Sequence, residues 1–160
     1  MLDEPVVDSS SGLVKMRVPH DAAETVERLE AVLKEKQIHV FARIDHAAGA
    51  ASVGLRLRPT TVLIFGNPQV GTALMQSNQT IGIDLPLKML VWEDDKKQTW
   101  LAYNDPAYLA RRHGMGDQEA TVAAMAAALK GLARGDGAGR LIQGEGRVEK
   151  GLRRPAAARS

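Results

Sequence analysis

The segment TTVLIFGNPQVGTALM, from Thr60 to Met75, changes its hydrophobic period partway along. Its first half is β-branched, aromatic and apolar on both faces, which is typical of a strand in the interior of a sheet. In the second half the apolar residues follow helical spacing, at Val70, Leu74 and Met75. The chain therefore has to turn from a strand into a helix within a few residues.

The turn itself is Gly66-Asn67-Pro68, and each of these residues has a mechanical explanation. Gly66 permits backbone angles that a side chain forbids, Asn67 is a favourable N-cap, and Pro68 suits the first helical position. A P-loop needs Lys-Ser/Thr after its glycines, and a dinucleotide fingerprint needs three spaced glycines. Neither pattern is present, so we interpret the turn as architectural, although the N–H groups of a helix start also suit an anion.

Other segments of the chain also switch between the strand spacing and the helix spacing of apolar residues. Strands are predicted at Leu13–Val18, Ile38–Asp45, Thr60–Gly66, Pro86–Glu93 and Gln98–Tyr103. Longer helices are predicted to begin at Asp21, Asn67, Asp105 and Asp117, and HAAGAASVG is predicted to be a short helix or a close-packed turn. The DDKK linker has the length of a hairpin turn, and two helices close the order. We therefore expect an α+β fold with two layers, in which helices pack on one face of a mostly antiparallel mixed sheet.

Length and charge define the expected domain organisation. A chain of 160 residues fits one domain, which we place at 13–134, after a flexible N-terminal segment 1–12 and before a mobile Gly/Arg-rich tail 135–160. From residue 130 onward eight basic residues face three acidic ones, whereas the first 129 residues carry a net charge of −3. The basic character therefore belongs to the tail, and we do not expect the folded part to bind nucleic acid.

Several classes of site are disfavoured by residue usage. Cysteine is absent, which excludes disulfides, zinc–thiolate sites and thiol nucleophiles. No pair of histidines has metal-ligand spacing and no GxSxG motif occurs, so we predict neither a metal nor a cofactor. Without a signal sequence or a long apolar run we expect a cytoplasmic protein with no membrane partner.

Four segments together resemble the domain-of-unknown-function 302 family: TVERLEAVLKEKQIHVFARIDHAAGA, LRPTTVLIFGNPQVGTALM, IGIDLPLKMLVWEDD and WLAYNDPAYLARRHG. The resemblance spans about Val14 to Leu132. It implies a compact two-layer α+β domain that usually forms a dimer, with no demonstrated reaction and no established cofactor. Family members commonly carry Gly where this chain has Gln37, so this residue either strains the end of the first helix or ends it differently.

Polar residues at the ends of the predicted strands form our candidate site. We hypothesise that they converge on one polar spot at the edge of the sheet: Asp45, His46, Arg58, Asn67 and Asp84. An adjacent carboxylate and imidazole suit acid–base chemistry, but neighbouring residues on a strand point to opposite faces. We therefore favour an N-cap at Asp45 or His46 and a structural hydrogen-bond network over a catalytic site. For Asp84 the partners we expect are Arg58, Lys88 or the Asn67 amide.

The function that the sequence favours is that of a binding module. We expect a self-associating domain, a homodimer, that holds a small molecule or a partner in a cleft between sheet and helices. The alternative is an enzyme with acid–base chemistry at Asp45, His46 and Asp84. Nucleic-acid binding through the tail is the third hypothesis. No recognisable catalytic motif is present, so the sequence leaves enzymatic activity open and favours a non-enzymatic role.

Overall fold

The computed structural model describes residues 3–135, which fold into one six-stranded sheet with helices. The strands are β1 (Val6–Asp8), β2 (Leu13–Val18), β3 (His39–Asp45), β4 (Thr60–Gly66), β5 (Leu87–Glu93) and β6 (Thr99–Asn104). The helices are α1 (Ala22–Glu35), α2 (His46–Ser52), α3 (Pro68–Ser77), the 3₁₀ helix η1 (Gln79–Ile83), α4 (Pro106–Arg112) and α5 (Glu119–Ala133).

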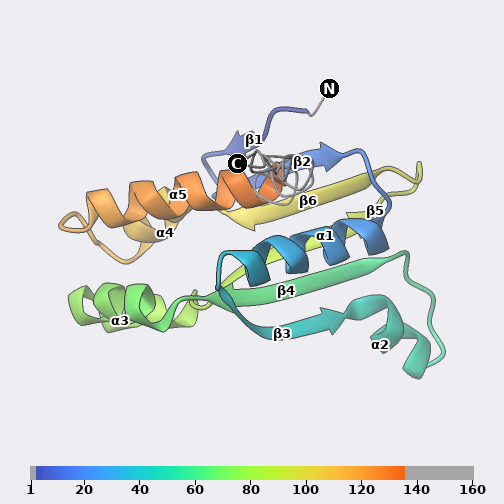
Figure 1. Ribbon diagram of the computed structural model, residues 1–160, viewed down its shortest axis with the longest axis horizontal. Coiled ribbons are helices and arrows are strands. Elements are labelled where there is room, and N and C mark those ends of the chain that lie inside the picture. The colour runs from blue at the N-terminus through green and yellow to red at the C-terminus, as the bar shows by residue number, and fades with distance from the viewer. Residues whose placement is uncertain (1–2, 136–160) are drawn as a thin grey trace, which may run out of the picture.

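The sheet has the order β1-β2-β6-β5-β4-β3, and every pair of neighbouring strands is antiparallel (Figure 1). Helices α1 and α5 lie on the same side of the sheet, while α2 and α3 lie beyond opposite ends of β4. The expected α+β fold, with helices over one face of the sheet, is therefore confirmed. The expected mixed character of the sheet is not seen among residues 3–135, since no pair of strands there is parallel.

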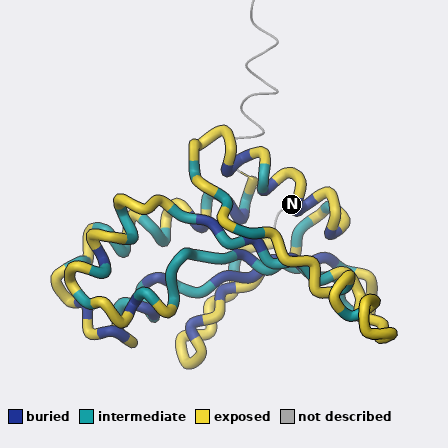
Figure 2. Tube along the Cα trace, turned by 90° about the horizontal axis from the view of Figure 1, so that it is seen from below, coloured by how far each residue is buried: buried dark blue, intermediate teal, exposed yellow. Residues whose placement is uncertain are grey.

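The main hydrophobic core lies between α1, α5 and one face of the sheet. Strand β2 shows why, because its buried residues Val14 and Met16 alternate with exposed ones. Helix α1 contributes a buried stripe, with Val26, Leu29 and Leu33 each at most 3% exposed. Figure 2 shows the buried residues gathered in the middle of the molecule, with the outer turns exposed.

The expectation for the N-terminal segment needs correction, whereas the expectation for the C-terminal tail concerns residues that the structure does not describe. Residues 6–8, expected to be flexible, form strand β1 and pair with residues 13–15 of β2. Gly12 stabilises this hairpin, because its φ of 72° favours glycine and an added Cβ would lie 2.2 Å from the Tyr108 ring. The tail expected to be mobile lies outside the described residues from 136 onward.

The hairpin predicted at DDKK joins β5 to β6. Asp94 organises it, since its carboxylate accepts hydrogen bonds from the backbone N–H groups of Lys96 and Gln98 and from the Trp100 indole at 2.8–2.9 Å. The bond from Trp100 is the main reason why the pKa of Asp94 is lowered from its ordinary value. The turn predicted from Asp and Lys residues is thus held mainly by the first aspartate.

The C-terminal end of α1 shows how the helix ends at Gln37, where related proteins commonly have glycine. The N–H of Gln37 donates to Lys34 and that of Ile38 donates to Leu33, the hydrogen-bond pattern of a Schellman motif. In this motif the residue after the C-cap is left-handed, and Gln37 accordingly has a φ of 56°. The helix ends as a glycine would end it, but with a side chain that disfavours this conformation.

We predict that Gln37→Gly raises the free energy of unfolding by about 0.5–1 kcal/mol. Relief of roughly 1–2 kcal/mol of left-handed strain outweighs the roughly 0.4–1 kcal/mol of extra entropy in the unfolded chain. The control is Glu27→Gly, at an exposed position in the interior of the same helix, which should lose about 1 kcal/mol. Urea denaturation measures both, and a loss of stability in Gln37→Gly would contradict the assignment of strain to this residue.

Candidate functional site

A polar cluster forms where the end of α4 meets η1. His113, the C-cap of α4, has a side chain only 6% exposed. Its Nε2 atom lies 2.5 Å from Oδ2 of Asp84, and its Nδ1 atom lies 2.8 Å from Oγ1 of Thr80. Arg112 donates to both Asp84 oxygens at 3.1 and 3.2 Å. With Asn78, which bonds the His113 carbonyl oxygen, these residues form what we call the Asp84–His113 cluster.

The Thr80 hydroxyl lies between Asn78 and the imidazole of His113. Asn78 donates through Nδ2 to the His113 carbonyl oxygen, and its Oδ1 accepts from the Thr80 N–H at 3.1 Å and lies 2.9 Å from the Thr80 hydroxyl oxygen. The single hydroxyl hydrogen can bond either Asn78 Oδ1 or His113 Nδ1, according to the tautomer of the imidazole. Carboxylate, imidazole and hydroxyl thus form a chain of hydrogen bonds.

The cluster fastens α3 and η1 to the α4–α5 region. A second bond does the same nearby, because the Ser77 hydroxyl lies 2.7 and 3.0 Å from the two carboxylate oxygens of Asp117. That contact is the main cause of a lowered pKa for Asp117. Asp117 was predicted to open the last helix, but α5 begins at Glu119 with Gln118 as N-cap and no side-chain cap. Its carboxylate bonds α3 instead of capping its own helix.

Beside this fastening lies an apolar cavity of about 390 Å³ at the junction of α3, α5 and the adjacent ends of the strands. Its wall is almost entirely aliphatic, aromatic or glycine. The lining residues are Ile38, Phe41, Phe65, Gly66, Asn67, Pro68, Val70, Gly71, Thr72, Leu74, Met75, Gly82, Leu85, Pro86, Leu87, Met125, Ala128, Leu129 and Leu132.

The cavity lies between two clusters of buried hydrophobic residues, and both clusters contribute to its wall. Phe65, Leu129 and Leu132 belong to the main core under α1, whereas Leu74 belongs to a second cluster with Ile81 and Met115. All four of these cavity residues are at most 3% exposed. Their burial places the floor of the cavity between α3 and the main core, and its size and apolar wall are those of a small-molecule site.

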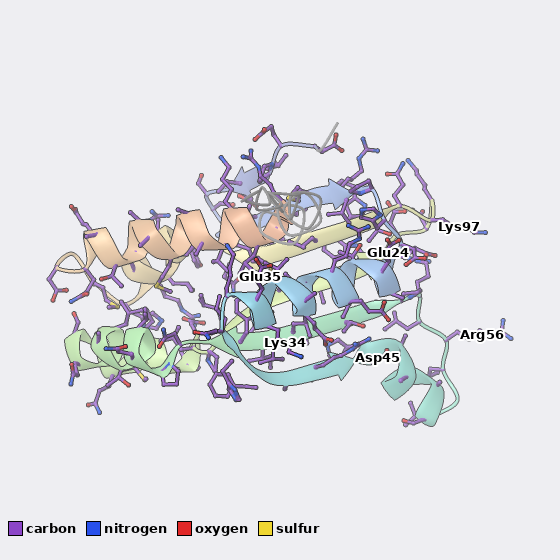
Figure 3. All side chains as sticks on the ribbon, viewed as in Figure 1. Glu24, Lys34, Glu35, Asp45, Arg56 and Lys97 are labelled. Carbon is purple, nitrogen blue, oxygen red and sulfur yellow. The ribbon has the colours of Figure 1, made fainter. Side chains whose placement is uncertain are left out.

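The structure does not bring the five predicted site residues together. Asp45 pairs with Thr61 at the start of β4, whereas Asn67 follows the end of β4. Figure 3 shows Asp45 beside α2, at the end of the sheet opposite α3. Phe65 is four residues further along β4 than Thr61, a distance of roughly 13 Å, and it pairs with Leu87, three residues after Asp84. The hypothesis of one polar spot is therefore wrong, because the antiparallel pairing of β3 and β4 puts these residues at opposite ends.

Each of these side chains has a local role. Asp45 caps α2 by accepting from the Ala48 N–H at 2.9 Å, and His46 is the first residue of that helix. Arg58 donates to the Glu93 carbonyl oxygen at 3.3 Å. Asn67 caps α3 through the Gln69 N–H at 2.9 Å. An acid–base site made of Asp45, His46 and Asp84 is excluded by the same separation, since proton transfer needs direct or single-water contact.

Asp84 has different partners from those expected. Arg58, Lys88 and Asn67 were the predicted groups, whereas Arg112 and His113 are the observed ones. The sequence analysis gave no role to Arg112 and His113, which meet Asp84 across 28 and 29 residues of chain. The available signal was the isolated carboxylate in IGIDLP, which required a partner.

Two kinds of feature that residues 3–135 lack bear on the kind of site. No helix there is long and apolar enough to cross a bilayer. No group of three or more His, Asp or Glu side chains in that part of the chain is arranged to hold a metal ion.

Comparison with known proteins places the sequence and its fold in a described class. Residues 14–132 match the family described as Domain of unknown function DUF302. The match covers most of the chain, so the chain belongs to the DUF302 family. The resemblance found in the sequence is thereby confirmed.

Three curated relatives are each 54% identical to this chain over 106 residues. They are named fluoride-specific ion channel FluC 1 in Brucella suis and Brucella abortus and FluC 2 in Brucella melitensis. The matched segment is 66% of this chain but only 39–42% of each relative. This chain therefore matches about two fifths of the length of these proteins.

A solved structure has the same fold. It is the crystal structure of an uncharacterized conserved protein DUF302 from Bacillus stearothermophilus, with a TM-score of 0.70 and 22% identity. The similarity covers 78% of this chain and 97% of that protein. At this identity the likeness concerns the fold alone.

We predict that Asp84→Ala lowers the free energy of unfolding by about 2–4 kcal/mol, because it leaves a buried imidazole without its partner. The control is Asp45→Ala, which removes an exposed helix cap and should cost about 1 kcal/mol. Chemical denaturation of both variants gives the comparison. If Asp84→Ala loses no more stability than Asp45→Ala, the cluster does not fasten η1 to α4.

Proposed function

We propose that this domain is a non-enzymatic binding module that holds a small apolar molecule in the cavity between α3 and α5. The observation that carries the proposal is a space of about 390 Å³ whose wall joins two otherwise separate hydrophobic clusters. A wall of this kind gains free energy when apolar surface replaces water in the space. Pre-formed apolar pockets of this size are the usual small-molecule sites.

Substitution of residues at the opening of the cavity tests whether the cavity binds an apolar molecule. Five lining residues are exposed and so mark the opening, among them Ala128 on α5. Its neighbour Ala127 is equally an exposed helical alanine but does not line the cavity. A bulky side chain at 128 should obstruct the opening, whereas the same side chain at 127 should not.

We predict that Ala128→Phe weakens binding of the uncharged fluorescent probe N-phenylnaphthylamine at least tenfold, because its ring occupies the opening. Ala127→Phe should bind the probe as the unchanged protein does, and thermal unfolding should show both variants folded. Fluorescence titration measures the affinities. Absence of probe binding to the unchanged protein, or equal binding by both variants, would overturn the proposal.

Self-association is the second part of the proposed function. Residues that alternate with the core positions lie on the sheet face opposite α1 and are half-buried or exposed: Ile44, Val62, Ile64, Leu90, Trp92 and Trp100. The rings of Trp92 and Trp100 stack with centroids 6.2 Å apart. A contiguous apolar face of this kind is characteristic of protein interfaces, and we propose that a second copy covers it in a homodimer.

We predict that the protein sediments as a dimer of the 17.2 kDa chain and that Leu90→Lys shifts it to the monomer. The charge would have to be buried between the two faces, which costs several kcal/mol if it is unpaired. Ile83→Lys is the control, since Ile83 is 75% exposed and lies outside the strands. Analytical ultracentrifugation decides, and a monomeric unchanged protein at tens of micromolar would refute this part.

The fluoride-channel name of the Brucella relatives is not part of the proposal. It describes proteins of which the matched segment is at most 42%. The cytoplasmic location expected from the sequence likewise stays a prediction.

A further inference from the structure

The chemistry of the cavity wall narrows the class of ligand, provided that the cavity binds one as proposed above. None of the lining residues carries a charge, and the only polar side chains among them are Asn67 and Thr72. Both are exposed, whereas Phe65, Leu74 and Leu129 are buried. The polar groups therefore lie at the opening and the apolar ones at the floor.

The polar groups at the opening are suited to donate hydrogen bonds. Asn67 uses its Oδ1 atom to accept from the Gln69 N–H, which leaves the Nδ2 group as its donor. Thr72 adds a hydroxyl. A ligand that meets these groups is best matched by an acceptor oxygen at the end of an apolar body.

The uncharged wall disfavours a charged head group, because it offers no ion pair. The carboxylate next to the lining residues in sequence, Asp84, is already paired with Arg112 and His113. Lys88 is bonded to the Pro86 carbonyl oxygen at 3.3 Å. A carboxylate held at Asn67 would gain no cation from the wall and few free N–H groups from the start of α3, because Pro68 has no N–H and those of Gln69 and Gly71 are bonded to Asn67. An ammonium group would gain no anion from the wall.

The volume sets the size of the ligand. A cavity of about 150 Å³ holds benzene, which has six carbon atoms, so 390 Å³ corresponds to roughly fifteen non-hydrogen atoms by the same scale. We infer that the ligand is an uncharged amphiphile of this size, with a single hydrocarbon chain or ring system and one terminal acceptor oxygen near Asn67.

Two isosteric compounds test the charge requirement. Decanamide and decanoate have the same chain and differ chiefly in the charge of the head group. In competition with N-phenylnaphthylamine at neutral pH, decanamide should displace the probe at a concentration at least tenfold lower than decanoate or decylammonium does. Equal or better displacement by decanoate would overturn the inference while leaving the binding function intact. No binding of the probe itself would instead refute the proposed function.

The role of Asn67 is tested by Asn67→Asp. An aspartate caps α3 as well as asparagine does, so thermal unfolding should be unchanged, but the donor becomes a charged acceptor. Decanamide should bind about fivefold more weakly, the value of one neutral hydrogen bond, and decanoate more weakly still, while the probe should retain its affinity. As the matched control, Gln76→Glu makes the same amide-to-carboxylate change at an exposed residue of α3 that does not line the cavity, and its ratio of decanamide to probe affinity should stay unchanged. If Asn67→Asp binds decanamide as tightly as the unchanged protein does, the acceptor oxygen of the ligand does not lie at Asn67.

Discussion

Burial of one face of an antiparallel sheet under α1 and α5 is the constraint on which the rest of this structure depends. Leu33, Leu63 and Met89 are fully buried there, on a helix and two neighbouring strands. Because side chains alternate along a strand, fixing one face of β4 also fixes what the other face presents. The same packing determines where each strand ends, and thus where α2 and α3 leave the sheet (Figure 1). Cavity and exposed sheet face are both consequences of this one-sided core.

The second constraint is polar and lies at the end of the sheet. Helix α3 and η1 extend beyond the strands, so the main core cannot hold them alone. The Asp84–His113 cluster and the Ser77–Asp117 bond join this unit to the α4–α5 region. Apolar contact is then left incomplete on the side facing α5, where the cavity lies. Polar fastening on one side and an apolar gap on the other make the unit suited to hold a ligand without enclosing it.

Buried histidine beside a carboxylate invites a catalytic interpretation, but no residue of the cluster lines the cavity. The Thr80 hydroxyl lies within hydrogen-bond distance of both Asn78 and the imidazole. Arg112 adds a further partner for Asp84. Every strong polar group in the cluster is occupied by another group of the same chain. Such a fully connected network specifies one packing arrangement, and we propose that binding takes place in the apolar cavity beside it.

Local sequence determined the elements of this protein, because period, caps and turns act over a few residues. The corner at Gly66-Asn67-Pro68 has the predicted N-cap, and LVKMRV has the predicted alternation. Only the tertiary structure decided which polar residues meet. The partners of Asp84 lie 28 and 29 residues away in the sequence. The register of β3 on β4 places Asp45 at the other end of the sheet. Pairings of this kind depend on how strands and helices are arranged in space, and no local pattern in a single sequence records that arrangement.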